Sequence, residues 1–499
     1  MTTSQPPDGG AVVGAAAAAE PVDRLSTPEA GPTAVRGGAM RVGGFVLASG
    51  LSILAAALLF RHLGHQDVGR YVTILALVAI VGGISDLGLT TLGIREMSVV
   101  AHSERAGLAR DLLGLRMILS VLGLAGMFAF ALLAYSVTVA AGVAIAGVGL
   151  LLQATQDNCG ATLQVELRFG AVASLDVLRQ LATAVLVALL VVLGAHLLVF
   201  VSVPIWVGAI VVVVAAWMLR GQRSLLPTFD RRRARRLVLL VLPFAAATIA
   251  SALYPQEAVV LIGLISNNHQ LSSYGIAVRV IQGIATVPAL LIGTALPIFA
   301  RAARDDQARF EYAIARVFEV ATIAGAGTAV ALAVGAPLAV KIIGGSSYHY
   351  ANGVLALQGI SFGISFVGSL WGNGLLSQGR YRALVVLNTA GAVGLAGLLA
   401  VLIPADGARG AAIAAAIVEL ALTITSCALV YRGRETRGPP LGVLPKTALA
   451  AGLALLPALW HQAPDIVRLL LAGVIFGATV LLTRAVPREM SALLPGRRS

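Results

Sequence analysis

Charged residues are scarce in this chain. Only 12% of its 499 residues are Asp, Glu, Lys or Arg, whereas 58% are hydrophobic. A soluble domain cannot bury that much apolar surface, so the composition indicates an integral membrane protein. The alternating pattern of membrane-spanning strands is missing as well, which favours spanning helices over a barrel.

Cysteine and the common catalytic motifs are equally scarce. Cys159 and Cys427 have no neighbouring Cys or His, so neither a disulfide framework nor a zinc site is predicted. Lys341 and Lys446 are the only lysines, and neither follows a glycine as in the phosphate-binding loop of ATP-driven pumps. The HExxH and C-x-x-C patterns are absent, and the G-x-S-x-G match at residues 359–363 lies inside the apolar run 352–376. The sequence therefore predicts no metal site, no cofactor and no enzymatic activity.

Apolar runs that are long enough to cross a bilayer recur along the chain. A spanning helix needs about 20 apolar residues, and this criterion predicts about 14 spans. Their approximate bounds are 42–60, 71–94, 113–134, 137–156, 174–194, 197–218, 237–265, 273–299, 312–335, 352–376, 383–403, 408–431, 446–460 and 466–483. Arginine-rich loops alternate with weakly charged ones, which the positive-inside rule explains if the N-terminus and the C-terminus are both cytosolic.

The spans are related by a weak internal repeat. The sequence HQDVGRYVT, from His65, aligns with HQLSSYGIA, from His269, and each copy has a Tyr at the start of its span. Both copies follow an odd-numbered span, so the predicted repeat is parallel, with six helices in each of two lobes around a central cavity. The predicted units are a disordered tail 1–39, an N-terminal lobe 40–218, a basic linker 219–236, a C-terminal lobe 237–433, and two additional helices with a basic tail 434–499.

Ionisable residues inside spans are the candidates for a function, because an unpaired charge is costly in the bilayer. Asp86, Glu257, Arg279 and Glu419 lie in predicted spans, and Arg279 is taken as the only cation there. Glu257 and Arg279 are predicted at similar depths on neighbouring antiparallel helices, where they can meet. Gln282 lies three residues after Arg279, on the same face. A substrate site and a structural ion pair are equal alternatives for Glu257 and Arg279, and packing or capping roles for Asp86 and Glu419 are at least as well supported as transport.

Prolines in the same two spans are candidates for gating. Pro255 cannot donate a hydrogen bond to the preceding turn and is predicted to bend span 237–265. Pro288 is a second such position, in span 273–299. A tolerated kink without a gating role is the alternative for both residues.

The order of motifs resembles that of a known family. The segment RHLGHQDVGRYVTILALVAIVGGISDLGLTTLGIRE, residues 61–96, resembles the first helical hairpin of O-antigen-type polysaccharide flippases of the MOP superfamily. The segment that begins with YPQEAVVLIGL, from Tyr254, is similar to the hairpin of spans 7 and 8 in that family, and GNGLLSQGRYRAL and GARGAAIAAAIVEL resemble its spans 10 to 12. The likeness covers residues 40–430.

This resemblance implies a flippase in the cell membrane. It would move a polyprenyl-pyrophosphate-linked oligosaccharide from the cytosolic to the outer leaflet by alternating access, among membrane lipids and with polysaccharide polymerase machinery as a candidate partner. Arg279 would bind the pyrophosphate, with Glu257 as its resting partner. An ion-coupled multidrug exporter and a lipid II flippase are the alternatives. Both fit less well, because residues 42–60 contain neither the acidic residue of the first nor the Ser-Arg-x-Leu-Gly stretch of the second.

Overall fold

The chain is helical throughout the part that the computed structural model describes, which comprises residues 47–219, 227–228, 230–285, 288, 307–432, 438–460 and 462–485. The helices are Leu47–His62, α2 (His65–Asp86), α3 (Leu89–Val99), α4 (His102–Ala134), α5 (Val137–Val165), α6 (Phe169–Val192), α7 (Leu197–Val201), α8 (Val203–Met218), α9 (Arg231–Leu253), α10 (Glu257–Ile265), α11 (Asn268–Ile284), α14 (Gln307–Ile343), α15 (Ala351–Ser377), α16 (Tyr381–Tyr431), α17 (Val443–Ala454) and α18 (Asp465–Leu482), with short 3₁₀ helices η2 (Ser346–Tyr348) and η3 (Leu456–Leu459).

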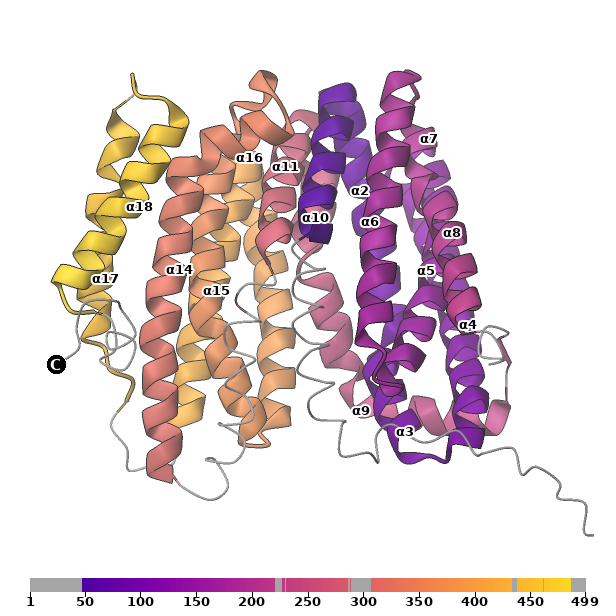
Figure 1. Ribbon diagram of the computed structural model, residues 1–499. Coiled ribbons are helices and arrows are strands. Elements are labelled where there is room, and N and C mark those ends of the chain that lie inside the picture. The colour runs from indigo at the N-terminus through magenta and orange to yellow at the C-terminus, as the bar shows by residue number, and fades with distance from the viewer. Residues whose placement is uncertain are drawn as a thin grey trace, which may run out of the picture.

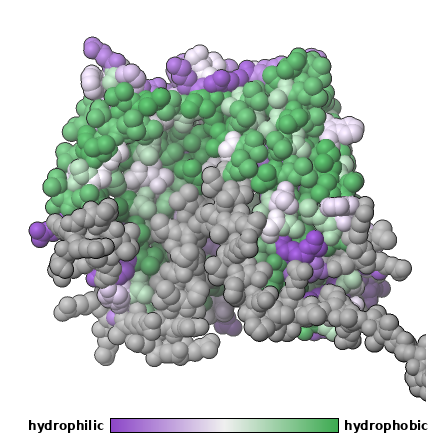
Figure 2. All heavy atoms as spheres, viewed as in Figure 1, coloured by the Kyte–Doolittle hydropathy of each residue, from purple (hydrophilic) through white to green (hydrophobic). Residues whose placement is uncertain are grey.

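The outer surface of the helices is mostly apolar, as in proteins that lie in a membrane. Within the described residues, 9 helices are long and apolar enough to cross a bilayer. Large apolar side chains point outward from them, such as Leu133, which is 90% exposed, and Leu482, which is 83% exposed. Figure 2 shows that the described part of one face is mostly hydrophobic, with hydrophilic residues along its upper edge. Exposed apolar residues on spanning helices fit contact with lipid, and the predicted multi-pass membrane protein is confirmed.

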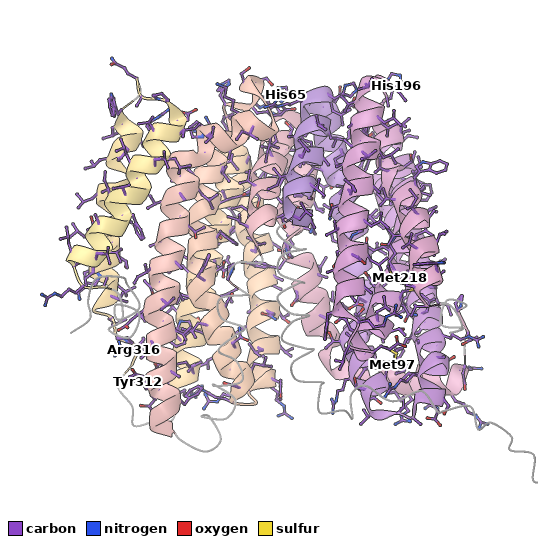
Figure 3. All side chains as sticks on the ribbon, viewed as in Figure 1. His65, Met97, His196, Met218, Tyr312 and Arg316 are labelled. Carbon is purple, nitrogen blue, oxygen red and sulfur yellow. The ribbon has the colours of Figure 1, made fainter. Side chains whose placement is uncertain are left out.

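The helices form two groups with α10 and α11 between them (Figure 1). Helices α2 and α4–α8 gather on one side, where α5 packs against both α4 and α8. Helices α14–α16 gather on the other, with α17 and α18 at their outer edge. Helix α2 also packs against α9, α10 and α11, so it joins the two groups. The two ends of the bundle are called here the His65 end and the Met97 end (Figure 3).

Small residues allow the closest helix contact, as expected for membrane helices. Gly325 of α14 faces Gly363 of α15 so closely that a Cβ on Gly325 would lie 2.3 Å from the Gly363 carbonyl oxygen. A Cβ on Gly363 would lie 2.7 Å from the Gly325 carbonyl oxygen. Neither atom belongs to a side chain that could move aside, so both positions require glycine.

Several predicted bounds differ from the helices. Span 71–94 begins earlier, at His65, and is interrupted after Asp86, where Leu87 and Gly88 have φ values of 43° and 79°. The stretch labelled α16 is not one continuous helix, because its backbone is non-helical at Asp406 and Gly407, the latter with φ 51°. Two helices meet at this kink, in agreement with the predicted spans 383–403 and 408–431.

The predicted units fall partly outside the described residues. This holds for the tail 1–39 and for part of the linker 219–236. Within the linker, Arg231 already begins α9, so the basic cluster is helical where it is described. For span 273–299, the helix α11 begins at Asn268 and is described to Ile284.

Candidate substrate-binding site

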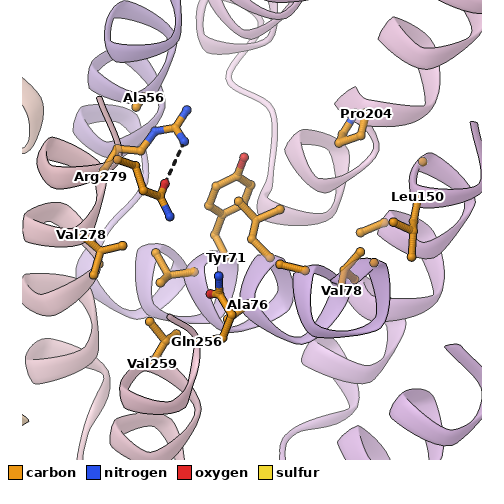
Figure 4. A pocket seen from close by; sticks show the side chains of 18 of the residues that line it. Ala56, Tyr71, Ala76, Val78, Leu150, Pro204, Gln256, Val259, Val278 and Arg279 are labelled. Atoms are coloured by element: carbon orange, nitrogen blue, oxygen red, sulfur yellow. Dashed lines mark hydrogen bonds between the residues drawn. The ribbon is translucent and has the colours of Figure 1, made fainter. Parts of the chain in front are cut away.

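A cavity of about 480 Å³ lies between the group of helices that contains α2 and the helices α10 and α11. Its walls come from the helix Leu47–His62 and from α2, α4, α5, α6, α8 and α11, together with the start of α10. Most of the lining is small or apolar, such as Ala76, Val78 and Leu150 (Figure 4). Polar groups gather where α10 and α11 meet α2, and we call this space the central cavity.

Arg279 is the charged residue of this polar region. Its guanidinium donates a hydrogen bond of 2.7 Å to the Ser52 hydroxyl and one of 3.3 Å to the Gln282 side-chain oxygen. Figure 4 shows a hydrogen bond of Arg279 as a dashed line, with Tyr71 reaching into the same space. The structure thus brings together Arg279 and Gln282, which the sequence predicts on one face. The neutral oxygens around Arg279 leave its positive charge uncompensated by any carboxylate among the described residues.

Glu257 does not pair with Arg279 in this conformation. The described residues record no ion pair between them, and the Glu257 carboxylate has one buried oxygen without a hydrogen-bond partner. The chain bends at Pro255, as predicted: α9 ends at Leu253, and Glu257 begins α10. The predicted meeting compared only the depths of the two residues on their helices, and depth does not fix the direction in which a side chain points around its helix. The carboxylate instead lies in the first turn of α10, where the helix dipole favours a negative charge.

Glu419 lies in a different cavity, of about 250 Å³, between α9, α15 and α16. The Tyr254 hydroxyl donates a hydrogen bond of 3.1 Å to its carboxylate. In the same cavity the Asn388 amide donates a hydrogen bond of 3.3 Å to the Ser251 hydroxyl. Glu419 is therefore separate from the surroundings of Arg279, contrary to the prediction of one shared cavity.

Asp86 lies in a third cavity, of about 380 Å³, in the group of helices that contains α2, α5 and α6. Its carboxylate is 3.4 Å from the Arg116 guanidinium, which also forms an ion pair of 2.8 Å with Asp157. Arg179 and Asp176 line the same space, so we call it the charged cavity. Asp86 is thus part of an ion-pair network rather than a direct neighbour of Arg279.

Arg116 and Asp157 are functional candidates that are missing from the residues predicted from the sequence. Arg116 lies inside the predicted span 113–134, so Arg279 is not the only cation within a span, and that prediction is wrong. Asp157 follows the predicted span 137–156 directly, but α5 continues to Val165. A search for every charge within one helical turn of a predicted span would have found both residues.

The cavities lie below a closed contact at the His65 end of the bundle. The rings of His65 and His269, the two residues aligned in the predicted repeat, have centroids 4.9 Å apart, and His65 also contacts Tyr348. A Cβ on Gly69 of α2 would lie 3.1 Å from the Asn268 carbonyl oxygen. Helices α2 and α11 therefore meet tightly at this end.

The remaining candidates are placed as follows. Pro255 is exposed in the turn before α10. Pro288 is buried, but its neighbours on both sides lie outside the described residues. Among the residues described, no three His, Cys, Asp or Glu side chains are grouped so that they could hold a metal ion.

One family model matches more than half of the chain. Residues 58–352 match the model of a family described as "Polysaccharide biosynthesis protein". No curated protein sequence matches significantly. Among solved structures, the lipid II flippase MurJ in an inward closed conformation superimposes with a TM-score of 0.73 at 10% identity, covering 90% of this chain and 99% of that one.

Two further structures share the fold. An inward-facing multidrug resistance MATE family transporter of the MOP superfamily gives a TM-score of 0.57 at 14% identity, covering 77% of this chain and 93% of that one. A MOP superfamily transporter from Pyrococcus furiosus gives 0.55 at 15% identity, with coverages of 80% and 94%. At these identities the likeness establishes the fold alone.

Proposed function

Because this chain belongs to the polysaccharide biosynthesis protein family and has the fold of MOP-superfamily transporters, we propose that it is a flippase for lipid-linked oligosaccharides. Its family is one of membrane transporters, not enzymes. The proposed substrate is a polyprenyl-pyrophosphate-linked sugar, which moves from the cytosolic to the outer leaflet for synthesis of a surface polysaccharide.

The observation that carries this proposal is the charge of the central cavity. Its described lining includes two arginines, Arg116 and Arg279, and no Asp or Glu. A pyrophosphate is the part of the substrate that needs cations, and a guanidinium can bind two phosphate oxygens at once. The neutral groups of Gln256 and Gln282 beside Arg279 suit sugar hydroxyls, which both donate and accept hydrogen bonds.

The apolar remainder of the lining suits the rest of such a substrate. Small residues of α2, such as Ala76 and Gly82, line the cavity together with apolar residues of α5 and of the helix Leu47–His62. The wall there offers few hydrogen bonds, so the first isoprene units and the apolar faces of sugar rings can lie on it without leaving polar groups unpaired. A pocket with an apolar body and a few fixed polar groups is typical of ligand sites.

We further propose an arrangement for the whole chain. It has about 14 spans, with lobes 40–218 and 237–433 joined by the linker 219–236, and with residues 434–499 added outside the lobes. The arginine-rich loops place the N-terminus, the C-terminus and the Met97 end in the cytosol. Rocking of the lobes, with Pro255 and Pro288 as gating candidates, would expose the central cavity to each leaflet in turn.

A second candidate function is export of amphipathic small molecules. The mostly apolar central cavity favours it, because such molecules need apolar surface more than they need cations. On this reading the carboxylate of Glu257, which has an unpartnered oxygen, would exchange a proton or another cation with the outside. Arg279 would then contribute little to binding.

Deletion of the gene distinguishes the two functions. The flippase predicts that lipid-linked sugar accumulates on the cytosolic leaflet and that a surface glycan is lost, also when the gene is replaced by its Arg279→Ala variant. Genes that encode polysaccharide polymerase machinery would then be required for the same glycan. An unchanged glycan together with hypersensitivity to amphipathic drugs would instead favour the exporter.

A further inference from the structure

Arg116 lies at the centre of an ion-pair network in the group of helices that contains α2. It projects from α4 with only 11% of its side chain exposed. Its guanidinium lies 2.8 Å from Asp157 and 3.4 Å from Asp86, and it donates a hydrogen bond of 3.2 Å to the Thr90 hydroxyl. A buried arginine is therefore held by two carboxylates from two other segments of the chain.

The same side chain borders two cavities of opposite character. It lines the charged cavity together with Asp86, Asp157, Asp176 and Arg179, where acids outnumber bases. It also lines the central cavity, whose described lining has no acid at all. Its Nε is buried and has no hydrogen-bond partner. The ion pairs of Arg116 thus leave one of its donors unpaired in this conformation.

The two arginines of the central cavity lie at different depths. Arg279 lies beside Tyr71 in the central cavity, close to the start of α2 (Figure 4), whereas Arg116 contacts Asp86 at the end of that helix. The 15 residues from Tyr71 to Asp86 span about 22 Å at the usual helical rise. One phosphate group cannot contact both arginines at once, but a headgroup that moves along the cavity can contact them in succession.

We propose that Arg116 is a second anion-binding residue of the transport path, which Asp86 and Asp157 hold until the phosphates of the substrate compete for it. The proposal deepens the proposed function and rests on it. Arg116 lies toward the Met97 end, the predicted cytosolic side, so it would receive the headgroup before Arg279 does. The competing groups are alike in kind, because carboxylate and phosphate oxygens both form charge-assisted hydrogen bonds with a guanidinium.

Competition between the aspartates and the substrate for Arg116 predicts other effects of substitution on binding than a purely structural ion pair does. If the aspartates compete with the substrate, then removing one carboxylate charge must strengthen substrate binding, while removing the guanidinium must weaken it. If the ion pairs only hold the helices together, both changes loosen the same contact and must act in the same direction. The sign of the two effects therefore separates the two roles.

The test measures binding of farnesyl pyrophosphate to the purified full chain in lipid nanodiscs, with farnesol as the ligand that lacks phosphate. We expect Asp157→Asn to tighten binding about threefold and Arg116→Gln to weaken it about tenfold, the usual scale for a hydrogen bond to a charged group. Arg116→Lys should recover part of the loss, because it restores the charge. Arg316→Gln is the matched control: Arg316 forms an ion pair of 2.7 Å with Glu319 but does not line the central cavity.

Different results would refute the role of Arg116 and the proposed function. Thermal melting first establishes that both variants are folded. The role of Arg116 is then overturned if Asp157→Asn and Arg116→Gln change binding in the same direction. It is also overturned if Arg116→Gln binds farnesyl pyrophosphate as tightly as the unchanged protein does. The proposed function itself fails if the unchanged protein binds farnesyl pyrophosphate no better than farnesol. Weaker binding in Arg279→Gln alone would support the function and refute the inference.

Discussion

Gly275 is a sensitive position in the contact that closes the His65 end of the molecule. In α11 it packs against Val72 of α2, and a Cβ at this position would lie 2.6 Å from one Val72 methyl carbon and 3.0 Å from the other. Carbon atoms in contact lie about 3.5 to 4.0 Å apart, so Gly275→Ala requires a separation of about 1 Å. Val72 is β-branched and cannot move both methyl groups away within its preferred rotamer.

The expected effect is a shift toward a conformation that is open at this end. Overpacking of this kind costs about 1 to 3 kcal/mol where helices cannot separate, and each 1.4 kcal/mol changes an equilibrium about tenfold. A conformation in which α2 and α11 have parted avoids this cost, so Gly275→Ala should populate it roughly tenfold more. Spin labels at the exposed residues Gln66 and Ser346, with Cys159 and Cys427 replaced by Ala, would report the change as a longer distance in double electron–electron resonance.

The control for this experiment is Gly126→Ala in α4, where an added Cβ meets nothing within 4 Å. It should leave the distance distribution unchanged. If Gly275→Ala also leaves the distribution unchanged and keeps the melting temperature of the unchanged protein, the contact between α2 and α11 is not a closure that the substitution can release, and the reasoning is refuted.

Three other predictions concern stability and are tested by thermal melting in detergent. Gly363→Val should abolish folding or lower the melting temperature more than Gly275→Ala does, because its Cβ meets the Gly325 carbonyl oxygen at 2.7 Å and backbone cannot yield. Tyr254→Phe should cost about 1 kcal/mol by removing the hydroxyl that donates to Glu419, and less when Glu419→Gln leaves only a neutral acceptor. Trp371→Ala should cost about 3 kcal/mol or more, because the side chain is 1% exposed and would leave a large void.

Each of these has its own contradicting result. Normal melting of Gly363→Val would mean that α14 and α15 do not cross as closely as described, with Gly473→Val, where a Cβ meets nothing within 4 Å, as the tolerated control. Equal losses from Tyr254→Phe with and without Glu419→Gln would show that the two side chains are not coupled. A Trp371→Ala variant with the same melting temperature as the unchanged protein would show that this part of the core repacks freely.

Helix positions could be predicted from the sequence because the bilayer sets a length for each apolar run. The ends were harder, and α5 shows why. It continues to Val165, past the predicted end at residue 156, because Gln156 and Asp157 face the charged cavity and not lipid. A count of apolar residues averages over all faces of a helix, so a polar inner face ends the predicted span too early.

The candidate site was predicted in part. Arg279 and Gln282 share the central cavity, as their spacing on one helix indicates. Similar depths of Glu257 and Arg279 did not suffice to predict that they meet, because depth along a helix leaves open the direction of each side chain around it. Arg116 was overlooked because basic residues near the end of a span are usually topological signals. Only the tertiary packing of α2, α4 and α5 shows that this arginine is buried between two carboxylates.

Transfer of a lipid-linked substrate between leaflets is the most direct test of the account. Purified protein can be reconstituted into vesicles that carry a fluorescent polyprenyl-pyrophosphate-linked oligosaccharide in one leaflet, and its appearance in the other leaflet can be followed by a membrane-impermeant quencher. If the chain is a flippase, transfer is faster with the unchanged protein than in protein-free vesicles, and Arg279→Ala loses that acceleration. Transfer no faster than in protein-free vesicles, or equally fast transfer by Arg279→Ala, would contradict the account.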